Sequence, residues 1–196
     1  MKVVAFNGSG RKDGNTAILI RRVLQVLESE GIETELIQLA GQQIHGCTAC
    51  KMCQKTQNKQ CKIVNDNVNT YIDKMLNADG IILGSPTYFS NVNSEMKAFM
   101  DRAWYVSRAN DDMFKRKVGA AVVAVRRAGG IATFDTLNHF FLISQMIVPG
   151  SSYWNIGVGL NKGDVEKDEE GLQTMDDLGA NMAWLLKKTG SHKKRK

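Results

Sequence analysis

Residues 2–16 read KVVAFNGSGRKDGNT, a short apolar run that passes directly into a loop rich in glycine and small polar residues. Residues 2–6 are typical of a buried strand, and apolar residues at helical spacing follow the loop. The apolar positions on one face of that helix are Leu19, Val23, Val26 and Leu27. A strand, a glycine-rich loop and a helix in this order predict the first unit of an α/β fold.

The same alternation continues along the chain. Further strands are expected at residues 33–39, 80–84, 118–125 and 153–158. Helical patterns are expected at 68–76, 96–104, from about 131 and at 172–186, with a polar loop at 161–170. Near-continuous apolar strands separated by helices predict a parallel sheet covered on both faces. We therefore expect a flavodoxin-like three-layer α/β sandwich with a five-stranded parallel sheet in the order 2-1-3-4-5.

A ligand in such a sheet binds at the carboxyl ends of the strands, where the strand order reverses. The loops after the first, third and fourth strands therefore become the candidate site. The first of them resembles a phosphate cradle rather than a Walker loop or a dinucleotide fingerprint, because its glycine spacing fits neither. Its candidate phosphate ligands are Ser9, Arg11, Asn15 and Thr16. The alternative is a plain glycine-rich turn capped by Asn15 or Thr16.

The two other loops suit a flat ring. SPTYFSNV, from residue 85, places a rigid turn and two aromatic rings at the sheet edge, and RRAGG, from residue 126, lets the backbone approach a ligand beside a cation. The candidate residues are Pro86, Thr87, Tyr88, Phe89, Asn91, Arg126, Ala128, Gly129 and Gly130. Tyr88 and Phe89 could instead be core or interface aromatics, and each arginine a solvated charge.

All four cysteines of the chain lie within fifteen residues, in the segment of about 45–63 after the second strand. They are Cys47, Cys50, Cys53 and Cys61. Three thiols at intervals of three with a remote fourth favour a 4Fe–4S cluster over zinc, which is commonly held by two separated pairs. Zinc and metal-free thiols stay open as alternatives. No signal peptide or membrane span is visible, so we expect a reduced, cytoplasmic protein without disulfides.

Composition limits the remaining classes. The 196 residues, 43% of them hydrophobic, suit one domain, expected at 1–190. Six of the 26 basic residues lie in the last ten, which equals the net charge of +6, so the rest of the chain is formally neutral. We expect 191–196 to be a disordered basic tail. No aromatic residue accompanies it, which argues against nucleic-acid binding.

These motifs together resemble the NADPH-dependent FMN reductases of the flavodoxin-like group and, within them, the iron–sulfur flavoproteins. The resemblance implies that Ser9, Arg11, Asn15 and Thr16 hold the FMN phosphate. It also implies that 86–89 flank the isoalloxazine and that the four cysteines bind iron. It further implies a homodimer or homotetramer, for which Asp101, Arg102 and Trp104 are candidate interface residues.

Three functions are compatible with the sequence. The first is electron transfer from a ferredoxin-like donor through a 4Fe–4S cluster to FMN and on to a small acceptor, with no separate catalytic acid or base. The second is an NAD(P)H-dependent reductase of flavin or quinone without a cluster. The third is a non-catalytic metal-binding or thiol-sensing module. The three histidines form no triad; only His45, two residues before Cys47, merits a test.

Overall fold

The computed structural model describes the backbone of residues 1–193 and the side chains of residues 1–190. The strands are β1 (Lys2–Asn7), β2 (Glu33–Gln38), β3 (Gly80–Pro86), β4 (Val118–Val125) and β5 (Ile156–Val158). The helices are α1 (Asn15–Ser29), α2 (Met52–Thr56), α3 (Val68–Asn77), α4 (Ser94–Ala109), α5 (Gly130–Ile143), the 3-10 turn η1 (Asp164–Lys167) and α6 (Glu169–Lys193). The backbone of residues 191–193, the start of the expected basic tail, continues α6, and residues 194–196 lie outside the described residues.

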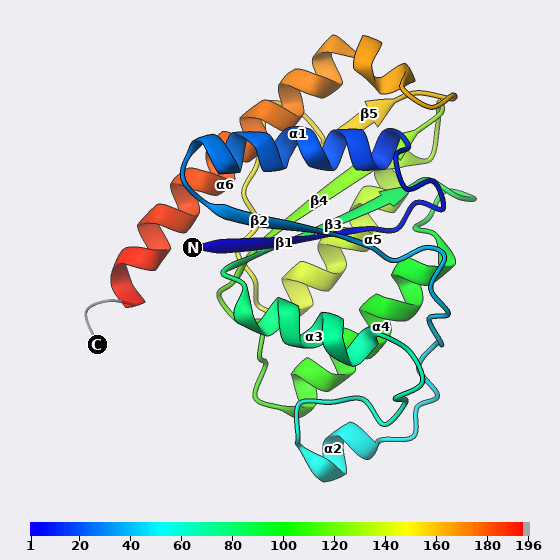
Figure 1. The fold of residues 1–196 in the computed structure, drawn as a ribbon, viewed down its shortest axis with the longest axis vertical. Helices are drawn as coiled ribbons and strands as arrows, with labels where there is room; N and C mark the ends of the chain where they lie inside the picture. The colour runs from blue at the N-terminus through cyan, green and yellow to red at the C-terminus, as the bar shows by residue number, and fades with distance from the viewer. Residues whose placement is uncertain (194–196) are drawn as a thin grey trace.

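The five strands form one sheet in the order β2-β1-β3-β4-β5, and every neighbouring pair is parallel. Both the order and the direction confirm the prediction. Because all strands run the same way, the loops that follow β1, β3 and β4 gather at one edge of the sheet, on the right of Figure 1.

Successive residues of the inner strands point to opposite faces, so each face has its own core. Val3 and Ala5 pack on one side with α1 and α6, whereas Val4 and Phe6 pack on the other with α3, α4 and α5. Figure 1 shows these two helical layers above and below the sheet. The predicted three-layer sandwich is confirmed.

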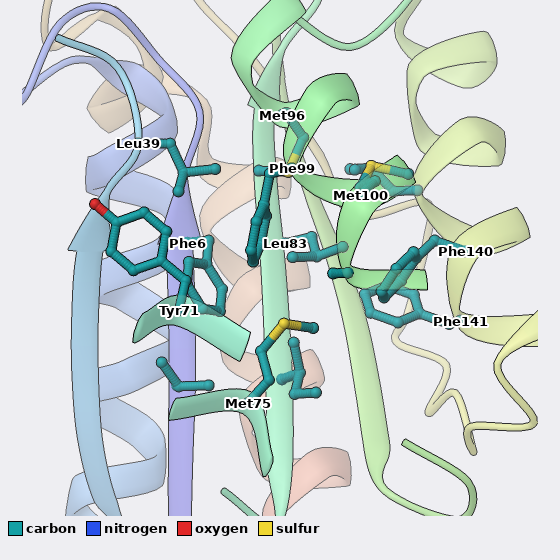
Figure 2. Close-up of a cluster of buried hydrophobic side chains, with 14 of the residues drawn as sticks. Phe6, Leu39, Tyr71, Met75, Leu83, Met96, Phe99, Met100, Phe140 and Phe141 are labelled. Carbon is teal, nitrogen blue, oxygen red and sulfur yellow. The ribbon is translucent and has the colours of Figure 1, made fainter. Parts of the chain in front are cut away.

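The layer formed by α3, α4 and α5 is rich in aromatic and methionine side chains (Figure 2). Phe6, Tyr71 and Phe99 come from β1, α3 and α4, and the ring of Tyr71 meets Phe6 and Phe99 edge to face at 5.9 Å in each case. This packing stabilises the position of α4 against the sheet, and α4 reaches both of the sites described below.

Two elements differ from the expectation. β5 is a strand only from Ile156, not from Tyr153, because Tyr153 and Trp154 are exposed and the Ile156 amide bonds back to the carbonyl of Trp154 at 2.6 Å. The short helix α2 was not predicted, since its five residues include no buried one. Within the described residues, no helix is both long and apolar enough to cross a membrane.

Candidate functional site

The loop after β1 is fixed to the neighbouring strand and to α4. The Gly8 amide donates to the carbonyl of Gly84 at 2.8 Å, and the Asn93 side chain donates to the carbonyl of Gly8 at 2.6 Å. A Cβ added at Gly8 would lie 2.4 Å from the Asn93 side-chain oxygen, so this contact requires glycine. Asn93 is buried and precedes α4, and sequence reasoning missed it.

A second set of polar contacts comes from β2. The Asn7 side chain donates to the Gln38 side-chain oxygen at 2.7 Å, and Gln38 in turn donates to the carbonyl of Ser9 at 2.5 Å. The Ser9 amide bonds to the Asn7 side-chain oxygen at 3.1 Å. Gln38 stands where a dinucleotide-binding protein would carry a ribose-binding acid, and here it supports the loop instead.

The N-terminus of α1 has the properties of an anion site. No side chain caps it and its first turn contains no acidic residue, so its free amides and the positive end of the helix dipole face the loop. Ser9 and Thr16 are buried beside it, and both line a cavity with Arg11. These donors fit a phosphate monoester, as a bound FMN would present.

Asn15 also holds two loops together. Its side-chain amide donates to the carbonyl of Asn161 at 2.8 Å, and its side-chain oxygen accepts from the Gly163 amide at 2.8 Å. Both polar atoms therefore hold the loop after β5 against the start of α1. Asn15 also lines the cavity, as predicted.

The loop after β3 closes in a tight turn. Tyr88 and Asn91 exchange both backbone hydrogen bonds, at 2.9 and 3.0 Å, while Phe89 and Ser90 have φ of 50° and 58°. Two consecutive positive φ values define a type I′ turn, which strongly prefers glycine or asparagine. The turn holds the ring of Phe89 fully exposed at its tip. Such strain is characteristic of functional loops.

Gly129 locks the third loop against this turn. It has φ of 83°, and a Cβ there would lie 2.5 Å from the Ser90 hydroxyl and 3.0 Å from the Ser90 Cα. The hydroxyls of Thr133 and Thr87 lie 3.2 Å apart beside it. The backbone of the RRAGG segment therefore approaches the β3 loop closely, as its glycines suggest.

The three loops enclose one cavity of about 210 Å³. The predicted residues that line it are Ser9, Arg11, Asn15, Thr16, Pro86, Thr87, Tyr88 and Arg126. Phe89, Asn91, Ala128, Gly129 and Gly130 do not line it; they shape the two loops around it. Ala124, Val125, Gly159 and Leu160 complete the wall, and sequence reasoning did not single them out.

The cysteine segment leaves β2 and runs along α4 to α2, away from the edge that carries this cavity (Figure 1). Four of its non-glycine residues have positive φ: Ala49, Lys51, Gln57 and Lys59, at 51°, 57°, 47° and 63°. Each costs roughly 1–2 kcal/mol relative to ordinary backbone. A loop with this much strain needs contacts or a ligand to hold it.

All four cysteines line a second cavity of about 100 Å³, far larger than a single water needs (~10–15 Å³). They are free thiols, and within the described residues no three His, Cys, Asp or Glu side chains converge on a point where one ion could be held. Four cysteines around one cavity supply the four thiolate ligands that a 4Fe–4S cluster needs, and a zinc ion can take the same number.

The thiols differ in their surroundings. A hydrogen bond from the Met52 amide and another from the Thr48 hydroxyl lower the pKa of Cys50, which is exposed. Burial raises the pKa of Cys53, and the neighbouring Cys61 and Cys47 thiols add to the rise. The backbone of Cys61 is clamped by Asn69, which accepts from its amide at 2.7 Å and donates to its carbonyl at 3.0 Å.

Arg102 corrects an expectation. It was a candidate interface residue, but only 1% of its surface is exposed, and it bonds within the chain to Asp66 and to the Cys61 sulfur, the latter at 3.3 Å. Asp101 and Trp104 are partly exposed, and both line a groove between α4 and α5. The amide and the ring of His45 contact Asp66, at 3.1 and 3.4 Å, and His45 is not among the residues that line the cysteine cavity.

The sheet order and the cavity at its switch point define a flavodoxin-like protein. Solved structures agree: RosB in complex with 8-demethyl-8-formylriboflavin 5′-phosphate superposes with a TM-score of 0.74 at 15% identity, over 97% of this chain and 81% of that one. A WrbA-like flavodoxin of Agrobacterium tumefaciens gives a TM-score of 0.65 at 16% identity, over 95% of this chain and 97% of that one. At such identities the likeness shows the fold alone.

Sequence comparison carries the assignment further. Residues 1–161 match the NADPH-dependent FMN reductase family. An iron–sulfur flavoprotein of Methanocaldococcus jannaschii is 40% identical over 95% of this chain and 98% of its own length, and one of Methanosarcina thermophila is 30% identical over 95% of each chain. The chain belongs to the NADPH-dependent FMN reductase family, and within it to the iron–sulfur flavoproteins. It is a flavin-dependent oxidoreductase with FMN as its cofactor.

Proposed function

We propose that the protein takes electrons from a low-potential, ferredoxin-like donor at a 4Fe–4S cluster held by Cys47, Cys50, Cys53 and Cys61, and delivers them through FMN to a small acceptor. The observation that carries the proposal is the common cavity of the four thiols, in a strained loop that α3 and α4 hold in place. The similarity to relatives named iron–sulfur flavoproteins supports the same proposal.

The chain's own residues give each part of the flavin a defined place. The free amides at the start of α1, with Ser9, Thr16 and Arg11, bind and neutralise the phosphate. The turn around Phe89 and the backbone at Gly129 shape the cavity in which the ring lies, and Arg126 at its wall favours negative charge there. Bound FMN supplies the hydride and single-electron chemistry itself.

Helix α4 connects the two proposed sites within one protomer. Asn93, just before its first residue, holds the phosphate loop, and Arg102 contacts the cysteine segment. The two residues are nine positions apart, a rise of roughly 14 Å along the helix at 1.5 Å per residue. We infer a homodimer or homotetramer that brings the cysteine site of one protomer towards the flavin of another; light scattering on the purified protein tests this.

The second candidate is an NAD(P)H-dependent reductase of flavin or quinone in which the cysteines are only structural. The family match favours it. The two candidates differ in the electron donor, so the donor decides between them.

The test is anaerobic reduction of the flavin, followed by its absorbance, with either NADPH or a reduced bacterial-type ferredoxin. We expect the ferredoxin to reduce the wild-type flavin rapidly and the Cys50→Ser variant at least tenfold more slowly, with flavin content unchanged in both. Equal rates in the two proteins with NADPH, and no reaction with ferredoxin, contradict the proposal and establish the second candidate.

A further inference from the structure

Arg102 lies inside α4 with its side chain directed at the cysteine segment, and it is the largest fully buried side chain among the described residues. A buried guanidinium costs several kcal/mol unless a counter-ion and hydrogen bonds compensate it. Asp66 provides the counter-ion, and the two side chains are 0% and 1% exposed. Fold stability alone does not explain such a pair, because its replacement by apolar residues of similar volume often leaves the stability of a protein unchanged or increases it.

The hydrogen bonds of Arg102 use the whole guanidinium. Nη1 donates to Asp66 and to the carbonyl of His45 at 3.1 Å, and Nη2 donates to Asp66 at 3.0 Å and to the carbonyl of Ile63 at 3.0 Å. Nε donates to the sulfur of Cys61 at 3.3 Å. A guanidinium has five N–H donors, so every donor of Arg102 has a partner. The ammonium group of a lysine has three donors and could not make the same set of bonds.

The contacts therefore fall into two groups with different consequences. The four bonds to His45, Ile63 and Asp66 fix the two ends of the cysteine segment on α4. The remaining bond reaches one of the four thiols directly. A hydrogen bond to a ligand sulfur favours the more negative state of an iron–sulfur centre and raises its reduction potential.

Resting on the proposed function, we propose that Arg102 is a positioning residue of the cysteine site: its Nε–H holds the Cys61 sulfur and raises the reduction potential of the bound cluster, while Asp66 limits that effect by balancing the cation. The pair sets the potential through charge and one hydrogen bond. It does not ligate iron.

This assignment predicts shifts of opposite sign. Arg102→Gln removes the cation and the bond to Cys61, so the cluster becomes harder to reduce. Arg102→Lys keeps a positive charge without the fork, so its shift has the same sign and is smaller. Asp66→Asn keeps the shape and leaves the cation uncompensated, so the cluster becomes easier to reduce. A role in packing alone gives no such ordering of signs.

The experiment is a redox titration of the anaerobically reconstituted proteins, followed by electron paramagnetic resonance of the reduced cluster. The matched control is Arg108→Gln, on the same helix, whose exposed side chain pairs with Asp112 at 2.8 Å. We expect the reduction potential of the cluster to be lower in Arg102→Gln than in the wild type, and intermediate in Arg102→Lys. It should be higher than wild type in Asp66→Asn and unchanged in the control. If the Arg102 variants do not fold, the comparison of Asp66→Asn with the control tests the proposal, because only Asp66→Asn should raise the reduction potential of the cluster.

Unchanged potentials and spectra in loaded variants, or a shift of Asp66→Asn in the same direction as Arg102→Gln, overturn the role of Arg102. Failure of the wild-type protein to take up iron and sulfide is a different result. It contradicts the proposed cluster, and the role of Arg102 falls with it.

Discussion

Single side chains and glycines hold the loops around the flavin cavity in place more than any helix or strand does. Asn93, Gln38 and Asn15 each bond to a loop that is distant in sequence, and Gly8 and Gly129 let two backbones touch. None of these three side chains needs to contact a ligand in order to matter. The loops around the cavity are therefore held in shape before any cofactor arrives, which lowers the ordering cost of binding.

Replacement of Gly129 by alanine tests this at one position. The new Cβ would meet Ser90 at 2.5 Å in a backbone conformation with φ of 83°. We expect the free energy of unfolding to fall by about 1–3 kcal/mol and FMN to bind more weakly. Urea unfolding and flavin fluorescence measure both quantities. Gly150→Ala, where the Cβ meets open space, is the control; equal effects of the two variants speak against the close approach.

Replacement of Thr16 by valine tests the phosphate site. Valine keeps the shape of this buried side chain and removes its hydroxyl. A hydrogen bond to a charged group contributes about 1.5–3 kcal/mol, so FMN should bind at least tenfold more weakly. Riboflavin, which has no phosphate, should bind the variant and the wild type alike. If riboflavin loses as much affinity as FMN, Thr16 does not act on the phosphate.

At the scale of elements, α1 and the sheet followed from apolar spacing, because strands buried on both faces and helices with one buried face leave strong patterns. The side chains that hold the loops in place could not be predicted from this spacing. Asn15 bonds to residues 146 and 148 positions away in the sequence, and Arg102 pairs with Asp66, 36 positions away. The spacing of apolar residues carries no information about such partners. The cysteine cluster was visible because its members are close in sequence, whereas the residues that hold it in place come from α3 and α4.

The edge strand β2 supplies a prediction of pH dependence. A hydrogen bond from Lys74 on α3, and a weaker contribution from Lys2 on β1, lower the pKa of Glu35 below its ordinary value of 4.5. Glu35 therefore stabilises the fold above about pH 4.5, and this stabilisation is lost as the pH falls through the lower value in the folded protein.

Glu35→Gln should consequently lower stability at neutral pH by no more than about 1 kcal/mol, since the pair is partly exposed, and should flatten the acid limb of the stability curve. Thermal unfolding of both proteins between about pH 3 and 7 measures the loss of stability and its dependence on pH. A variant whose loss of stability grows towards acid pH contradicts the assignment.

At the scale of the whole molecule, the two sites lie at different parts of α4 and occupy different edges of the fold. Ligands should therefore act on them separately. Addition of FMN to iron-free protein should slow hydrogen exchange in residues 8–16, 86–91 and 126–130, with little change in residues 45–66. Reconstitution with iron and sulfide should do the reverse. Protection of the cysteine segment by FMN alone would show that the sites are coupled.

The cofactor content of the protein after anaerobic purification shows whether one chain holds both a flavin and a cluster. We predict one FMN with about four iron and four sulfide per chain, and a Cys50→Ser variant that loses the iron while it keeps the flavin. FMN without iron, even after anaerobic reconstitution, would contradict the account and leave a nicotinamide-dependent flavin reductase in its place.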